Sequence, residues 1–135
     1  MSKLGIAAVV IFGFIFQAMI PLRALSAEFS VYEVFRSVDL GESDRPPPKD
    51  IFINMGSNQG VKKGAVLDVY RKISSFDNLT EKLAGEHVIP VGRIKVIHVD
   101  DKTAIARADR FVSMEQEPAL LPQAIMIGDL VRQAE

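Results

Sequence analysis

The sequence predicts an all-β protein, a small antiparallel β-barrel that follows an N-terminal signal peptide. Three observations support this prediction. From residue 50 onwards, short apolar runs rich in β-branched residues alternate with turns that contain glycine. No long stretch after the leader has the apolar period of a helix. The chain holds no cysteine, so a small exported domain would depend on burial and strand pairing, and a closed sheet hides its edges.

Residues 1–27 have the pattern of an export signal. Lys3 precedes an apolar run over 4–20, and small residues follow it, so cleavage after Ala27 or after Ser26 would release the mature chain. A retained membrane anchor is the alternative, because about 17 apolar residues is the lower limit for a span. We expect a periplasmic protein, or one that is anchored in the inner membrane and faces the periplasm. Any membrane contact is expected only through an uncleaved leader.

The composition argues against nucleic-acid binding and against zinc sites built from cysteine. The 16 basic and 17 acidic residues give a net charge of −1, and the basic residues are scattered along the sequence. Nucleic acid is therefore not an expected partner, since binding to phosphates needs clustered cations. The absence of cysteine excludes zinc sites of the thiolate type. The length after the leader fits one domain.

Residues 28–50 are expected to precede the barrel as an N-terminal strand and a connector. The segment 29–38 is rich in β-branched and aromatic residues, which favours a strand, although Val31 and Val34 also fit one face of a helix. The segment 41–49 contains three consecutive prolines, which cannot donate to a strand ladder. We expect that segment to be extended and exposed to solvent.

The barrel itself is expected over 51–135. Its predicted strands are 51–55, 65–73, 91–99, 103–108 and two short halves within 124–132. Residues 74–90 form a polar interval, predicted either as a helical turn capped by Asp77 or as an extended loop. Residues 100–102 are predicted as a hairpin turn.

The predicted strand 103–108 carries a row of small residues. Ala104, Ala106 and Ala108 alternate, which predicts one crowded inner face where another strand approaches closely.

The positions of glycine and aspartate predict where the chain turns. The residues assigned to structural turns are Gly56, Gly60, Gly64, Gly92, Gly128 and Asp129. Glycine adopts positive φ without steric penalty, so the loop 56–64 can turn sharply around a buried Val61. At the last turn, Asp129 is expected to accept amide protons.

Five segments of this chain resemble the C-terminal domain of bacterial flagellar assembly protein T. They are INMGSNQGVKKG (53–64), LDVYR (67–71), VGRIKV (91–96), AIAR (104–107) and IGDLV (127–131). The resemblance covers roughly 51–132. It implies a small SH3-like β-barrel in an exported envelope protein, from a family that contributes to a periplasmic ring around the flagellar basal body. The additional N-terminal domains of that family have no counterpart between the leader and the barrel.

Few residues suggest chemistry at a site. His87 and His98 are the only imidazoles, and a carboxylate-flanked histidine could ligate a metal, but isolated histidines in loops are more often hydrogen-bonding groups in solvent. Asp100 and Asp101 fit the tip of a hairpin better than an acid–base pair. We therefore predict no catalytic residue, no cofactor and no metal ligand.

Four apolar residues are candidates for contact with a partner: Tyr70, Phe76, Leu120 and Leu121. Tyr70 and Phe76 could form a surface for sugars or peptides, or they could be half-buried aromatics of the barrel. Leu120 and Leu121 lie between two prolines and could cover the end of the barrel or meet a partner.

We expect a non-enzymatic, exported interaction or scaffold module of the bacterial cell envelope, with the flagellar basal body as the setting that the resemblance implies. Its partners would be envelope or basal-body proteins, bound through 74–90, 111–124 and strand addition at 29–38. A homo-oligomeric ring is one expected arrangement. The alternative is a binding module for cell-wall glycan such as peptidoglycan, or a scaffold of the rod-shape or pilus type.

Overall fold

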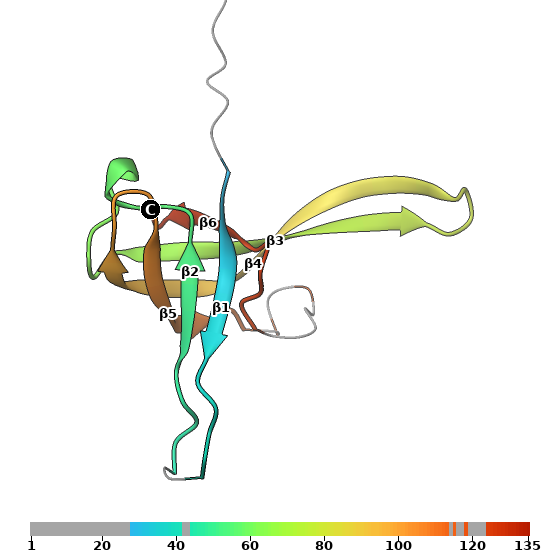
Figure 1. Cartoon of the computed structure of the whole chain (residues 1–135). Helices are drawn as coiled ribbons and strands as arrows, with labels where there is room; N and C mark the ends of the chain where they lie inside the picture. The colour runs from blue at the N-terminus through green and yellow to red at the C-terminus, as the bar shows by residue number, and fades with distance from the viewer. Residues whose placement is uncertain (1–27, 42–43, 114, 116–117, 119–123) are drawn as a thin grey trace, which may run out of the picture.

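The computed structural model describes residues 28–41, 44–113, 115, 118 and 124–135. Six strands of these residues close into one antiparallel barrel in the order β1-β2-β5-β4-β3-β6 (Figure 1). The elements are β1 (Phe29–Arg36), β2 (Lys49–Ile53), the 3-10 helix η1 (Ser57–Gln59), β3 (Val66–Asp77), β4 (Lys82–Val99), β5 (Ala104–Phe111) and β6 (Leu130–Gln133). The prediction of an all-β fold with a small SH3-like barrel is confirmed. The predicted leader, 1–27, lies outside the described residues.

On β2, β3, β4 and β5 the core is built from apolar side chains two positions apart, because alternate residues of a strand face the same side. Its largest fully buried members are Ile51, Ile53, Leu67, Ile94, Val31, Val69, Val96 and Val131. Ala104 and Ala106 are buried against them, as predicted. The prediction is wrong for Ala108, which is exposed because the alternation of side chains on β5 is lost beyond Ala106, beside two irregular steps in its pairing with β4.

Strand β1 is a member of the barrel, so the predicted barrel start at residue 51 is too late. β1 pairs with β2 over most of its length and with β6 through Phe29 and Ser30. The sequence of 29–38 was compatible with a strand or a helix, and the structure forms a strand there. This pairing reduces the part of 29–38 that is open to strand addition, because Phe29 and Ser30 pair with β6 and the residues from Val31 onwards pair with β2.

The segment 74–90 is neither a helical turn nor a loop but the outer part of the β3–β4 hairpin. β3 pairs with β4 along its whole length, from Val66 opposite Lys95 to Asp77 opposite Lys82. Within the barrel, β6 covers only Leu67–Tyr70 of β3, and β5 pairs with β4 only from Gly92 onwards. Residues 72–90 therefore extend beyond the barrel as a two-stranded ribbon, which we call the arm (Figure 1).

The predicted turn glycines divide into two groups. Gly60, Gly64 and Gly128 have φ of 81°, 88° and 93°, the left-handed region that glycine tolerates best. Gly56 and Gly92 have no positive φ; a Cβ would lie 2.4 Å from the Asp100 carbonyl oxygen at Gly56, and 2.3 Å from a carbonyl oxygen of β5 at Gly92. Gly92 thus lies inside β4 and permits close strand approach, which corrects its assignment to a turn.

Candidate functional site

The arm carries large apolar side chains in solvent. Phe76, Leu79 and Leu83 are 57%, 95% and 61% exposed, and Val88 is also exposed. Phe76 and Leu83 are cross-strand partners, so their side chains are neighbours on one side of the ribbon, and Leu79 lies in the turn at the end. Exposed apolar side chains gathered on a projecting element are typical of a docking surface. Phe76 was a sequence candidate; Leu79 and Leu83 were not.

A buried ion pair joins Arg71, on β3 at the base of the arm, to Asp129, the residue before β6. Arg71 donates from Nε to Asp129 Oδ1 at 2.7 Å and from Nη2 to Asp129 Oδ2 at 2.8 Å, and also from Nη2 to the Ala124 carbonyl at 2.6 Å. Asp129 is only 3% exposed and accepts the Met126 amide at 2.8 Å, the turn role predicted for it. The hydrogen bond that Arg71 donates to Asp129 raises the pKa of Arg71, so the guanidinium stays charged. The arm therefore leaves the barrel from a fixed base.

The far end of the arm is held by Asp77. Its Oδ1 accepts the Leu79 amide at 2.8 Å and its Oδ2 accepts the Thr80 hydroxyl at 2.8 Å. These bonds favour the carboxylate and lower the pKa of Asp77, the Thr80 hydroxyl having the largest effect. Asp77 was expected to cap a helical turn; it caps the hairpin turn by the same side-chain chemistry.

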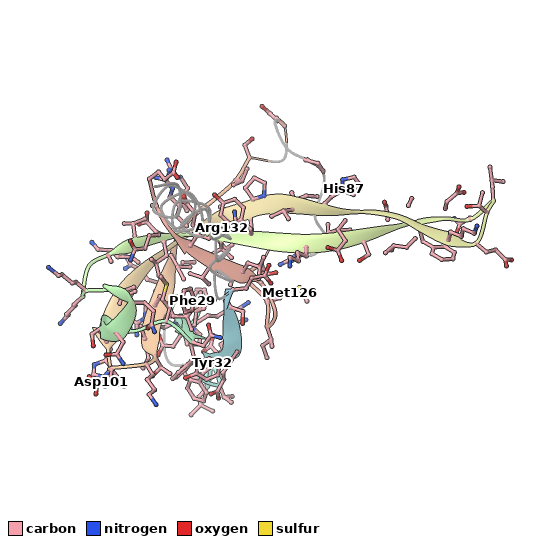
Figure 2. All side chains as sticks on the ribbon, turned by 90° about the horizontal axis from the view of Figure 1, so that it is seen from above. Phe29, Tyr32, His87, Asp101, Met126 and Arg132 are labelled. Atoms are coloured by element: carbon pink, nitrogen blue, oxygen red, sulfur yellow. The ribbon has the colours of Figure 1, made fainter. Side chains whose placement is uncertain are left out.

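Tyr70 lies where the arm meets the barrel, beside a groove of about 490 Å³ that Arg110 and Phe111 also line. The guanidinium of Arg132 lies over the Tyr70 ring, 5.0 Å from its centroid, so one face of the ring is occupied. Figure 2 places Arg132 at this junction. Phe76 is six residues further along β3, which is roughly 20 Å in an extended strand. The structure therefore does not bring Tyr70 and Phe76 into one stacking surface.

The two histidines are not brought together. His87 lies along the arm, with Nε2 3.3 Å from the Ser75 hydroxyl (Figure 2). His98 Nε2 is 3.2 Å from Oδ1 of Asp100, whose neighbour Asp101 is labelled at the opposite end of the molecule from His87 in Figure 2. Among the residues that the structure describes, no three His, Asp or Glu side chains gather as a metal site would require. The candidates Leu120 and Leu121 lie outside the described residues.

Asp100 and Asp101 lie in the turn between β4 and β5, as the sequence predicted. The Asp100 amide donates to the Thr103 carbonyl at 2.9 Å. The backbone carbonyls of the two aspartates accept the amides of Ser57 and Asn58 at 2.9 and 3.0 Å. This contact ties η1 to the end of the barrel, and nothing in the sequence indicated it.

Comparison with known proteins gives no match to a family model and none to a curated protein. The resemblance to flagellar assembly protein T therefore stays a prediction. Within the described part of the chain, no helix has the length and apolar character needed to cross a bilayer.

Proposed function

We propose that this protein is a non-enzymatic interaction module of the bacterial cell envelope, exported to the periplasm, and that the arm is the element that binds its partner. The proposal rests on the exposure of large apolar side chains on the arm. Phe76, Leu79 and Leu83 are largely exposed on it, and burying such side chains fully is worth about 1.5–3 kcal/mol each.

The construction of the arm suits it for binding. Its backbone is already paired in a hairpin, and Arg71 and Asp129 fix its base, so little conformational entropy is lost when a partner covers it. Segment 74–90 was expected to be a contact surface. The proposal keeps that role and assigns it to the exposed apolar residues of the segment. The flagellar basal body is the setting that the sequence resemblance suggests for the partner.

The geometry favours the arm over a glycan-binding role. Sugar binding by stacking needs an open aromatic face, but Arg132 covers one face of Tyr70 and Phe76 lies too far along β3 to share a ligand with it. Retention of the purified protein on isolated peptidoglycan would argue for the glycan role instead.

Complementation of a deletion strain tests the proposal. The strain would carry the wild-type gene, an arm variant (Phe76→Ser, Leu79→Ser and Leu83→Ser) or a matched control. The control variant changes Phe35, Val38 and Leu40 to serine; these are also exposed apolar residues, but they lie in β1 and the β1–β2 connector. We expect only the arm variant to lose crosslinks to its envelope partner and to fail complementation.

The readouts separate the parts of the proposal. An arm variant that crosslinks and complements like the wild type would refute the role of the arm. Normal swimming and intact basal-body rings in the deletion strain would remove the flagellar setting alone. Unprocessed full-length protein found in the cytosol would refute export.

A further inference from the structure

Strand register gathers positive charge on one outer face of the barrel. Asp68 on β3 lies opposite Arg132 on β6 and opposite Arg93 on β4, and Arg93 lies opposite Arg110 on β5. Two residues further along β4, Lys95 lies opposite Arg107. We call this set the cationic face: Arg93, Lys95, Arg107, Arg110 and Arg132, with Asp68 among them.

Like charges placed directly opposite each other destabilise a sheet, yet two such pairs are found here. Arg93 donates to Asp68 at 2.7 Å and Arg107 to Asp50 at 2.7 Å, which neutralises two of the five cations. No ion pair of the described residues involves Lys95, Arg110 or Arg132. Even with the exposed Asp109 counted, positive charge exceeds negative charge here, on a chain whose net charge is −1.

The cationic face borders a hollow with apolar walls. The groove of about 490 Å³ is lined by the charged residues Arg93, Arg110 and Asp68, whose carboxylate Arg93 pairs with, and by apolar side chains that include Tyr70, Pro90 and Phe111. A ligand that fits it would combine negative charge with apolar side chains.

The outer arm has that combination. Beyond Ser74 it carries the acids Asp77, Glu81 and Glu86 and one base, Lys82, which lies opposite Asp77. Glu81 and Glu86 are exposed and take part in no ion pair of the described residues. The exposed Phe76, Leu79 and Leu83 lie beside them.

The arm cannot reach the groove of its own chain, because it extends away from the barrel that holds the groove (Figure 1). We propose that the arm of one copy docks in the groove and on the cationic face of a second copy. This inference rests on the proposed function, since it uses the same arm. Both surfaces lie on the outer side of β3, so one two-fold axis can bring each arm to the cationic face of the other copy.

The experiment measures the mass of the protein, purified from cells that express the full chain, by analytical ultracentrifugation. We expect the mass to rise from one chain towards two between about 1 and about 500 µM at low salt, the range of a modest interface. Raising NaCl to about 1 M should weaken association at least about tenfold, because screening weakens attraction between exposed charges. A protein that stays monomeric throughout would overturn the proposal.

Charge reversal identifies the two surfaces. A groove variant (Lys95→Glu with Arg110→Glu) and an arm variant (Glu81→Lys with Glu86→Lys) should each lose self-association at least about tenfold. Mixed in equal amounts, they should form a heterodimer of near wild-type affinity, because both of its arm-to-groove contacts then join opposite charges. A control variant with Arg36→Glu and Lys102→Glu, exposed bases elsewhere, should associate like the wild type.

Three outcomes would overturn self-docking: association that survives either charge reversal, a mixture that stays monomeric, or binding of the cationic face to vesicles of anionic lipid by a protein that remains a monomer. Circular dichroism would verify that each variant is folded. These measurements use the pure protein alone, so their failure leaves docking of the arm to an envelope partner intact. Failure of the complementation test would leave self-association intact.

Discussion

Replacing Asp129 by alanine tests the ion pair at the base of the arm. The substitution removes the acceptors of two hydrogen bonds from Arg71, at 2.7 and 2.8 Å, and of one from the Met126 amide, at 2.8 Å. Removing one partner of a buried pair costs about 3–5 kcal/mol. The side chain of Arg71 keeps 14% of its surface in water, so we place the loss near the lower limit, at about 3 kcal/mol.

Thermal unfolding followed by circular dichroism measures this loss. At about 4 °C per kcal/mol for a domain of this size, the melting temperature should fall by about 12 °C. The partner substitution Arg71→Met should also destabilise, because it leaves the 3%-exposed Asp129 without its counter-charge. In the double variant the losses should fall short of their sum by at least about 1 kcal/mol. A fall of less than about 3 °C for Asp129→Ala, or strictly additive losses, would refute the reasoning.

Three further outcomes are expected. Gly92→Ala should destabilise by at least about 2 kcal/mol in urea unfolding, because its Cβ would lie 2.3 Å from a backbone oxygen of β5. Gly85→Ala, whose nearest neighbour would be a serine hydroxyl at 3.9 Å, is the control and should change stability little. Gly64→Ala meets no atom within 4 Å but has φ of 88°, so strain alone should cost about 1 kcal/mol. In carbon-detected NMR titration the carboxyl pKa of Asp77 should lie below its ordinary value, and Thr80→Ala should raise it towards that value. Because the folded-state pKa is the lower one, the stabilisation by Asp77 is present above its ordinary pKa and is lost as the pH falls through the folded value.

The strands of the barrel were predictable where one side faces the core. Apolar residues two positions apart, such as Ile51 and Ile53 or Leu67 and Val69, mark a strand with one buried face, and the structure buries all four. The crowded alanine face was predicted correctly for Ala104 and Ala106 but not for Ala108, because the pairing of β5 with β4 is irregular there and a bulge in a ladder has no clear sequence signal.

The outer part of the arm was missed because its large apolar side chains are exposed; only near the base of the arm do Ile73 and Ile89 pack against the core. A strand with one buried face shows apolar residues at every second position. A strand exposed on both faces does not need this alternation, and 74–90 has polar residues at both odd and even positions. The prolines at 46–48 were similarly read as a boundary between segments. They instead lie in the connector that joins two neighbouring strands of one barrel.

The contacts of the site depend on register, which local sequence does not specify. Arg71 and Asp129 are 58 positions apart, and only the pairing of β3 with β6 brings them together. The basic residues looked scattered in the sequence for the same reason. Arg93, Arg110 and Arg132 become neighbours only because β3, β4, β5 and β6 lie side by side.

The pairing of β1 with β6 sets an order of events during synthesis. Phe29 lies opposite Val131, so the first strand waits for a partner that is made about 100 residues later. At about 5–20 residues per second, that wait is roughly 5–20 s on the ribosome. The β3–β4 hairpin can form earlier, since its two strands are joined by a short turn. A nascent chain can therefore assemble its arm while its barrel is still open.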